Sequence, residues 1–234
     1  MSTETTEAQG PVAAPKNRKG YKGLAMEGFI ARWYSKTTQK NVEQYRSYAK
    51  IVTEHVPEGS SVLEIAPGPG YLSVELAKLG NYKIVGLDIS KTFVDIATER
   101  ARAANVQVEF RQGDVAYMPF ANETFDFAIC TAAFKNFTEP VKAINEIYRV
   151  LKRGSSAVII DLRKDVTKAE INEAVDDMEL SRINSFVTRF TFNHGLVRSA
   201  YTKDQLRDFV SKTRFGTCEI VDDGIGLRLW LKKP

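Results

Sequence analysis

Cysteine and histidine are scarce in this sequence, which contains two of each among 234 residues. The two cysteines, Cys130 and Cys218, lie far apart and outside any metal-ligand spacing, so we expect reduced thiols in strands. The two histidines, His55 and His194, are too few for a histidine-rich metal site. We therefore predict no metal, and this cysteine usage is typical of a reducing compartment such as the cytoplasm.

Long apolar runs and a strong charge of one sign are also missing. No run approaches the roughly 18 residues that indicate a membrane span, and the start lacks the basic-then-apolar leader typical of secreted proteins. The chain has 33 basic and 29 acidic residues, a balance that predicts no nucleic-acid partner. We therefore expect a cytoplasmic protein, and its length suits one globular domain.

Composition divides the chain into a short tail and one domain. Residues 1–20 carry almost no large apolar side chain, which predicts a disordered tail. Residues 21–234 are expected to form the domain, beginning with a helical cap over 21–57. The cap contains a helix over 24–38 and a second one near 42–56. An aromatic pair on the first helix, Trp33 and Tyr34, is more typical of a core than of a site.

Strands and helices then alternate. Strands are expected at 61–65, 83–88, 106–112, 125–130, 156–162, 217–221 and 226–232. The last two are joined by a short connection and must pair antiparallel. A turn at "RGSS" is expected before the fifth strand, and a substrate-side insert at 163–201, beginning with a helix from 166. The pattern predicts an α/β fold: three Rossmann-like layers around a seven-stranded, mostly parallel sheet with an antiparallel terminal hairpin strand and helices on both faces.

The stretch "LEIAPGPGYLSVELA" lies between the first of these strands and a helix. Gly68 and Gly70 have no Cβ, so the chain can turn sharply there and a ligand can touch the backbone. Such a turn often binds the pyrophosphate of a dinucleotide. Here the third glycine of that motif is replaced by Ser73, and Glu64 would repel a pyrophosphate. A cationic ligand without phosphates fits better.

Carboxylates follow three successive strands at the edge where open parallel sheets bind ligands. Glu64 belongs to the first strand, Asp88 ends the second, and Asp114 follows the third. Asp88 is placed to accept hydrogen bonds from ribose hydroxyls, and Asp114 from the amino group of an adenine. A ligand with hydroxyls, an exocyclic amine and positive charge is indicated, and S-adenosylmethionine has all three.

The sequence also resembles the class I S-adenosylmethionine-dependent methyltransferases, in particular a small-molecule branch similar to the quinone C-methyltransferases. The resemblance covers about residues 50–162. It rests on five motifs in order: "VLEIAPGPG", "GLDIS", "GDVAYMPF", "FDFAIC" and "AINEIYRVLKRGSSAVIID". It implies a transferase that uses S-adenosylmethionine, releases S-adenosylhomocysteine and methylates a small molecule.

The family's cofactor-binding roles carry over to matching positions. The methionine part would be held by Glu64 and by the backbone of Ala66, Pro67, Gly68 and Gly70. The resemblance further implies Asp88 at the ribose, Ile89 beside the adenine, Asp114 and Val115 at the adenine, Thr131 near the methyl group and Tyr34 near the cofactor carboxylate. Ala66 stands where the family has its first glycine, and its methyl group is tolerable if the residue keeps a negative φ.

Acceptor-binding and catalytic candidates lie around the ends of the fourth and fifth strands. Phe134, Lys135 and Asn136 follow the fourth strand, and Arg163 follows the fifth. His194 and Asp161 are candidates for a general base. Other interpretations are a surface histidine, and an ion pair that joins Asp161 to Arg163 or to Lys164.

Two other functions compete with methyl transfer to a small, partly apolar or aromatic molecule. One is an NAD-dependent oxidoreductase, which the spacing of Asp88 permits but Glu64, Ser73 and Asp114 disfavour. The other is a non-catalytic binding module of the same fold, which the three acids disfavour. The sequence does not specify the acceptor or the oligomeric state.

Overall fold

The computed structural model describes residues 20–22, 26–38, 42–176 and 197–234. Residues 1–19 of the tail predicted at 1–20, His194 and most of the aromatic stretch before Tyr201 lie outside the described residues. The predicted division into tail, cap and insert stays a prediction.

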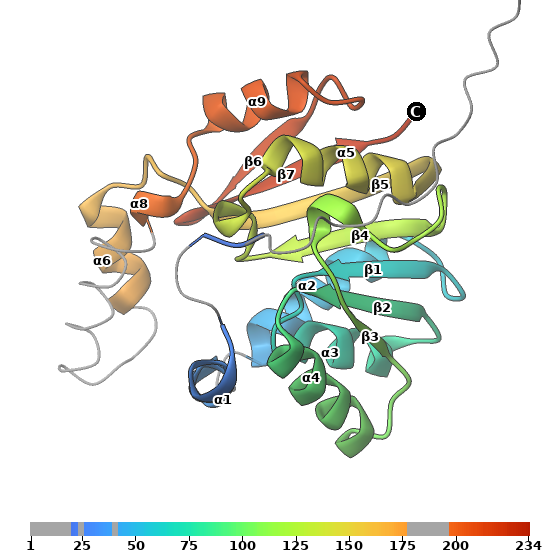
Figure 1. The fold of residues 1–234 in the computed structure, drawn as a ribbon. Coiled ribbons are helices and arrows are strands. Elements are labelled where there is room, and N and C mark those ends of the chain that lie inside the picture. Colours follow the sequence, from blue (N-terminus) through green and yellow to red (C-terminus); the bar gives the residue numbers. More distant parts are fainter. Residues whose placement is uncertain (1–19, 23–25, 39–41, 177–196) are drawn as a thin grey trace, which may run out of the picture.

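A seven-stranded sheet organises the described residues (Figure 1). Its spatial order is β3-β2-β1-β4-β5-β7-β6, and β7 runs antiparallel to both of its neighbours. The strands are β1 (Ser61–Ile65), β2 (Lys83–Asp88), β3 (Glu109–Gln112), β4 (Phe125–Thr131), β5 (Leu151–Leu162), β6 (Glu219–Asp223) and β7 (Gly226–Lys232). The predicted fold class is confirmed.

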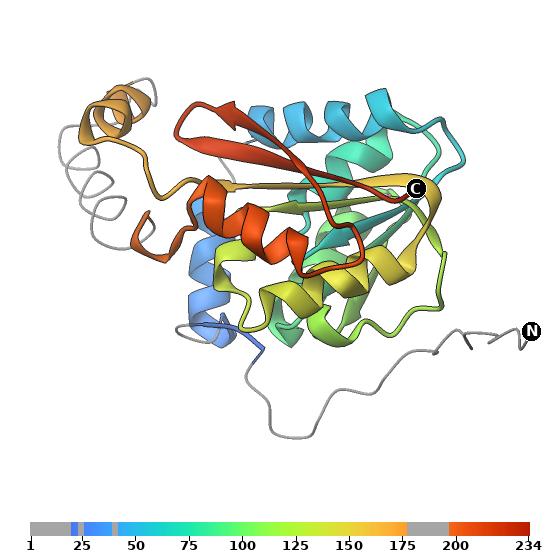
Figure 2. The ribbon, with the colours of Figure 1, turned by 90° about the horizontal axis from the view of Figure 1, so that it is seen from above.

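Helices cover both faces of the sheet, as Figure 2 shows from above. One face carries α2 (Val42–His55), α3 (Tyr71–Leu79) and α4 (Lys91–Ala103), and the other carries α5 (Pro140–Val150) and α9 (Lys203–Ser211). Beyond the carboxyl ends of the parallel strands lie α1 (Gly28–Thr38), α6 (Lys168–Asp176) and α8 (Val197–Ser199) (Figure 1). Two short 3-10 turns, η2 (Val115–Tyr117) and η3 (Phe134–Asn136), follow β3 and β4.

The central strand β4 shows how the sheet separates two cores. Successive side chains of a strand point to opposite faces, so Phe127 and Ile129 pack in the cluster that contains residues of α2 and α3. Ala128 and Cys130 pack on the other side, with residues of α5 and α9. Burial raises the pKa of the Cys130 thiol. This cysteine is the small buried residue that the sequence predicts.

Several predicted boundaries are wrong. β5 begins at Leu151, so "RGSS" lies within the strand; Gly154, at φ 75°, and Ser155 exchange backbone hydrogen bonds with Lys233. Those bonds come from the distant end of β7, which local turn residues cannot reveal. β3 starts at residue 109 rather than 106, and β6 covers 219–223 rather than 217–221.

The first helix also differs from its prediction. It begins at Gly28, because Glu27 instead accepts hydrogen bonds from the backbone of Lys91 and Thr92 at the start of α4. Trp33 is 58% exposed, so the expectation that it belongs to a core is wrong. Within the described residues, none of the helices combines the length and apolar character needed to cross a bilayer.

Candidate cofactor site

The turn between β1 and α3 requires glycine. Gly68 and Gly70 have φ values of 53° and 77°, in the left-handed region that disfavours side chains. A Cβ built on Gly70 would lie 2.7 Å from Cβ of Ala97, so this glycine also permits close packing of the turn on α4. A Cβ built on Gly68 would meet no atom within 4 Å. One side of the turn is therefore open to a ligand.

Ala66 adopts a left-handed conformation, with φ 53°. The condition that it keeps a negative φ is therefore wrong. The backbone is held in this shape because the Ala66 N–H donates to the carbonyl of Leu87 on β2, at 2.8 Å. A non-glycine residue in this region costs about 1–2 kcal/mol. The chain therefore keeps the turn at the expense of local strain.

Glu64 is buried at the base of this turn, with 3% of its surface exposed. The hydroxyl of Ser73, on α3, donates a hydrogen bond to its carboxylate. Burial raises the pKa of Glu64 to about 7, hydrogen bonds from Ser73 oppose the rise, and the charge of Asp88 adds to it. Ser73 stands where a dinucleotide motif has its third glycine, so the departure in the sequence supplies the partner of this acid.

Asp88 ends β2 directly beside the turn. One carboxylate oxygen accepts the N–H of Gly68 at 2.9 Å, and the other accepts the N–H of Ser90 at 2.8 Å. Burial raises the pKa of Asp88 to about 6, although these two hydrogen bonds favour the charged form. The carboxylate thus fixes the turn and stands where ribose hydroxyls are expected.

Whether Glu64 and Asp88 have cationic partners in the protein indicates which cofactor fits the site. Among the described residues, no lysine or arginine forms an ion pair with Glu64 or Asp88. Two buried carboxyls without a cation favour a ligand that brings positive charge and hydroxyl donors. A pyrophosphate would be repelled at the same place. The site therefore fits S-adenosylmethionine better than a nicotinamide dinucleotide.

The predicted adenine side is bordered by Ile89, Asp114 and Val115. Asp114 caps η2 by accepting the N–H of Ala116 at 2.8 Å, Val115 is buried, and Ile89 is 36% exposed. Residues 20–22, which we call the N-terminal strap, cross this region. A Cβ built on Gly20 would lie 2.7 Å from Cδ1 of Ile89 and still closer to the Asp114 carboxylate. The strap therefore adjoins the predicted position of the adenine.

Two tyrosines face the interior from the N-terminal segment. Tyr34 packs edge-on against Phe93, with ring centroids 5.9 Å apart. Burial raises its pKa, and the charge of Asp161 adds to the rise. Burial likewise raises the pKa of Tyr21, with contributions from Tyr34, Asp88 and Asp161 in that order. Both phenols therefore lie within electrostatic reach of the sheet edge where the candidate acids stand.

A buried ion pair joins the ends of β4 and β5. Nζ of Lys135 lies 2.7 Å from Asp161, and the Lys135 N–H donates to the other carboxylate oxygen at 2.9 Å. The ammonium also donates to the carbonyl of Ala132 at 2.6 Å. The two alternative pairings predicted for Asp161, with Arg163 or Lys164, are therefore wrong, because Lys135 is its partner.

The other acceptor-side candidates separate into two groups. Phe134 is buried and contacts the rings of Phe137 and Tyr201, and the backbone carbonyl of Asn136 accepts the N–H of Lys22. Arg163 points to α6, where it forms an ion pair with Glu170. Thr131 ends β4 and is partly buried. The cofactor, acceptor and catalytic roles of all these residues stay predictions.

Arg100 is a contact residue that the sequence reasoning missed. Its guanidinium lies 3.6 Å from the ring centroid of Tyr71 and donates to the carbonyl of Pro69 at 2.8 Å and to Oγ of Ser35 at 3.1 Å. The Tyr71 hydroxyl donates to the Ser35 carbonyl at 2.9 Å. Together these contacts fasten α1 to the glycine turn. Arg100 belongs to no recognisable motif, so nothing in the sequence around it indicates this role.

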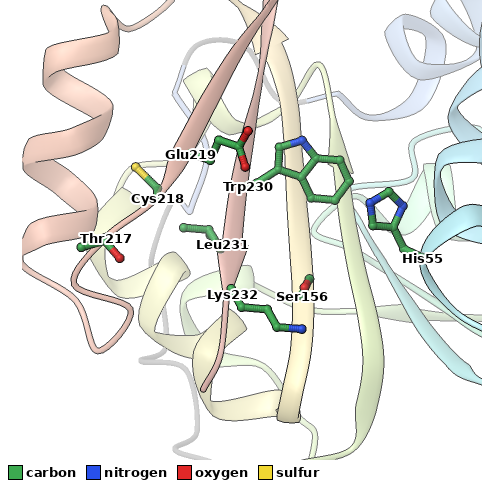
Figure 3. A pocket seen from close by; sticks show the side chains of 8 residues that line it. All are labelled: His55, Ser156, Thr217, Cys218, Glu219, Trp230, Leu231 and Lys232. Atoms are coloured by element: carbon green, nitrogen blue, oxygen red, sulfur yellow. The ribbon is translucent and has the colours of Figure 1, made fainter.

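A separate hollow of 660 Å³ lies against β6 and β7, at the amino-terminal half of the sheet (Figure 3). Its wall includes the stacked rings of His55 and Trp230, whose centroids are 4.5 Å apart. The remaining lining residues are Ser156, Thr217, Cys218, Glu219, Leu231 and Lys232. Ligands of open parallel sheets bind at the opposite, carboxyl edge. We therefore do not assign the cofactor to this hollow.

Comparisons with known proteins agree with the geometry at the carboxyl edge. Residues 63–159 match the model of a family described as a methyltransferase domain. Over these residues, which make up less than half of the chain, the sequence is similar to that methyltransferase family. The demethylmenaquinone methyltransferase of Deinococcus radiodurans is 30% identical over 117 residues, or 50% of this chain and 48% of that protein. The chain spans about half the length of the curated relatives it matches.

Solved structures extend the likeness of the methyltransferase domain to the whole fold. A Methanococcus maripaludis protein described as an S-adenosyl-L-methionine-dependent methyltransferase has a TM-score of 0.72 and 21% identity, covering 94% of this chain and 97% of that one. The plantazolicin methyltransferase BpumL, in complex with a monoazolic desmethylPZN analog and SAH, has a TM-score of 0.64 and 16% identity, covering 87% and 88%. At these identities the likeness is one of fold.

Proposed function

We propose that the protein transfers a methyl group from S-adenosylmethionine to a small, partly apolar or aromatic acceptor in the cytoplasm. The observation that carries the proposal is the pair of buried carboxyls, Glu64 and Asp88, beside the open side of the Gly68 turn. Neither carboxyl forms an ion pair with a lysine or arginine of the described residues, so the pair suits a cationic nucleoside. The relative from Deinococcus radiodurans, named a demethylmenaquinone methyltransferase, supports an acceptor with an aromatic ring.

In the proposed mechanism, the protein accelerates methyl transfer mainly by positioning the cofactor and the acceptor. When bound, the cofactor supplies a methyl group on a positively charged sulfur and leaves as a neutral thioether, so no general acid is required. Asp88, held in place by the Gly68 N–H, orients the nucleoside, and Glu64 offers negative charge on the methionine side. Holding two reactants in line accounts for a large part of such a rate enhancement.

The acceptor is expected to bind between the cofactor and the end of β4. Tyr201 is partly exposed there and is backed by the buried rings of Phe134 and Phe137, with centroids 5.5 and 5.9 Å apart in the two edge-on pairs. Such rings favour a planar apolar group and exclude water. Asp161 is the described candidate for holding a proton of the acceptor, but its bond to Lys135 makes it a positioning group first.

Cofactor binding is tested by isothermal titration with S-adenosylhomocysteine. Asp88→Asn is expected to raise Kd by about 10–100-fold, because a hydrogen bond to a charged group contributes roughly 1.5–3 kcal/mol. Asp95→Asn is the matched control, since Asp95 is an exposed acid on α4 paired with Lys91, and Kd should stay within about twofold. Equal Kd values for the two variants would refute the assigned site.

Methyl transfer is tested with labelled S-adenosylmethionine and a panel of quinols, phenols and aliphatic acceptors. The proposal expects label in an aromatic product with the natural sequence and with Asp95→Asn, and strongly reduced label with Asp88→Asn. Tight binding of S-adenosylhomocysteine together with label only in aliphatic products would keep the enzyme class and reject the aromatic acceptor.

A further inference from the structure

The outward face of α1 carries a cluster of exposed apolar side chains. Phe29 is 81% exposed, Trp33 58% and Ile30 39%. These positions share one face, because each helical residue turns by about 100°. Only three other large apolar side chains of the described residues are as exposed, and they lie on three other segments: Leu79, Ile89 and Val221. Scattered exposed apolar residues are ordinary, but a cluster of this kind marks an interaction surface.

The rest of the fold holds this face outward. Ala31 and Ser35, on the opposite side of α1, are buried. Ser35 accepts hydrogen bonds from Tyr71 and Arg100, and the Gly28 N–H donates to Oγ1 of Thr92 at 3.0 Å. The helix is thus fixed at both ends of its inner face. Phe29, Ile30 and Trp33 cannot turn inward without breaking these contacts.

Positive charge accompanies the apolar cluster. Arg32 and Lys36 are exposed on α1, next to the apolar face. Residues 15–40 contain one acidic residue, Glu27, and seven basic ones: Lys16, Arg18, Lys19, Lys22, Arg32, Lys36 and Lys40. The whole chain has 33 basic and 29 acidic residues, so the remainder is slightly acidic. In the sequence, the excess of basic residues therefore lies in the segment that contains α1.

We propose that α1 docks on the surface of an anionic lipid bilayer, with Phe29, Ile30 and Trp33 inserted at the level of the headgroups. Tryptophan prefers this interface, and a short helix with an apolar face bordered by basic residues binds in the plane of the membrane. Each nearby lysine or arginine adds attraction to an anionic leaflet. Two copies of this chain packed through α1 would instead bring like charges together, which disfavours a dimer.

Because of the position of α1, docking on a bilayer would affect how the acceptor reaches the protein. Figure 1 shows α1 beyond the carboxyl ends of the parallel strands, where the candidate cofactor site lies. Tyr34, also on α1, lies within electrostatic reach of Asp161. A docked α1 would hold the acceptor-binding end close to the bilayer, and this consequence rests on the proposed function. An acceptor dissolved in lipid would then reach the site without crossing water.

The test measures vesicle binding of the full chain, independently of methyl transfer. Phosphatidylcholine vesicles with and without about 30% phosphatidylglycerol are sedimented with protein at low and high salt. We expect binding only with the anionic lipid, weakened at least tenfold by high salt. Phe29→Ser with Trp33→Ser should reduce partitioning at least tenfold, as should Arg32→Gln with Lys36→Gln. Val221→Ser, an exposed apolar change on β6, is the matched control and should bind normally.

Fluorescence and oligomeric state complete the test. In a Trp230→Phe background, Trp33 is the only tryptophan, and its emission should shift to the blue with anionic vesicles alone. Unchanged circular dichroism and Tm show that the α1 variants fold. Absence of binding at low salt, or equal binding of the α1 variants and Val221→Ser, overturns the proposal. So does a concentration-dependent dimer that the α1 changes abolish, which would assign the face to a second copy.

Discussion

Ala66 is strained at the start of the cofactor turn, with φ 53°. We expect Ala66→Gly to raise the free energy of unfolding by about 1 kcal/mol, because relief of the left-handed strain exceeds the added freedom of the unfolded chain. Urea denaturation with an unchanged m-value measures the gain. The control is Ala103→Gly, in the exposed last turn of α4, where the same change should destabilise by roughly 0.5–1 kcal/mol. Destabilisation by both changes would contradict the role given to the turn.

Glu64 should make stability depend on pH in an unusual direction. Its folded-state pKa of about 7 exceeds the ordinary 4.5, so the folded protein retains a proton that the unfolded chain has lost. Stability therefore falls as pH rises from about 5 to 7 and is level above that range. Glu64→Gln should remove the part of this slope that Glu64 causes, and it should leave the part below about pH 6 that comes from the raised pKa of Asp88. Its free energy of unfolding relative to the natural sequence should rise by roughly 2–3 kcal/mol from pH 5 to 8. Urea titrations at four pH values measure it, and parallel slopes would refute the assignment.

At the residue scale, the sequence predicts the positions that follow directly from the order of strands and turns. The sequence could place Gly68, Gly70 and Asp88 at one edge of the sheet, because the carboxyl ends of parallel strands meet there. The contact of Arg100 with Pro69 joins residues 31 apart, and the Lys135–Asp161 pair joins residues 26 apart. Such pairs depend on how helices and loops pack, and no local pattern encodes them.

The Lys135–Asp161 pair fastens η3 to the end of β5, so its effect belongs to the scale of elements. Lys135→Met should destabilise the protein by about 3–5 kcal/mol, because it leaves a buried carboxylate without its cation. Lys135→Met with Asp161→Leu should restore much of the loss. Denaturation of the single and double variants measures this coupling. An additive or greater loss in the double variant would show that the two side chains do not act as a pair.

The N-terminal strap is expected to compete with the adenine. Its backbone adjoins Ile89 and Asp114, and it is held by the N–H of Lys22 donating to the carbonyl of Asn136 at 2.7 Å. A variant lacking residues 1–22 should therefore bind S-adenosylhomocysteine several-fold more tightly in isothermal titration. Weaker binding would instead assign the strap to covering the bound cofactor. Thr213→Ala is a control for general loosening, because Thr213 is remote from the site and its hydroxyl donates to the carbonyl of Val210 in α9.

The order of strands and helices was predictable at this scale, because apolar periodicity is local. The direction in which a helix faces was not, as α1 shows. Its pattern places Phe29, Ile30 and Trp33 on one side, but periodicity does not say which side is inward. The inner side is chosen by Tyr71 and Arg100, far along the chain.

At the scale of the whole molecule, a ligand that binds only the folded state stabilises all of it. S-adenosylhomocysteine at about 100 times its Kd should add roughly 2.7 kcal/mol, which corresponds to a Tm rise of about 5–10 °C for a chain of this size. NADH at the same concentration should leave Tm unchanged. Differential scanning fluorimetry with both ligands separates the proposed function from an NAD-dependent oxidoreductase, and a rise with NADH alone would favour the latter.

The sheet order has a consequence for synthesis on the ribosome. β7 follows β6 in the chain, yet it lies between β5 and β6. Until residues 226–232 leave the exit tunnel, β5 has a free edge whose backbone groups can pair with another chain. A nascent polypeptide that stalls after β6 therefore carries an open template for misassembly, and chaperones that shield strand edges should matter most between the exit of β6 and the exit of β7 from the ribosome.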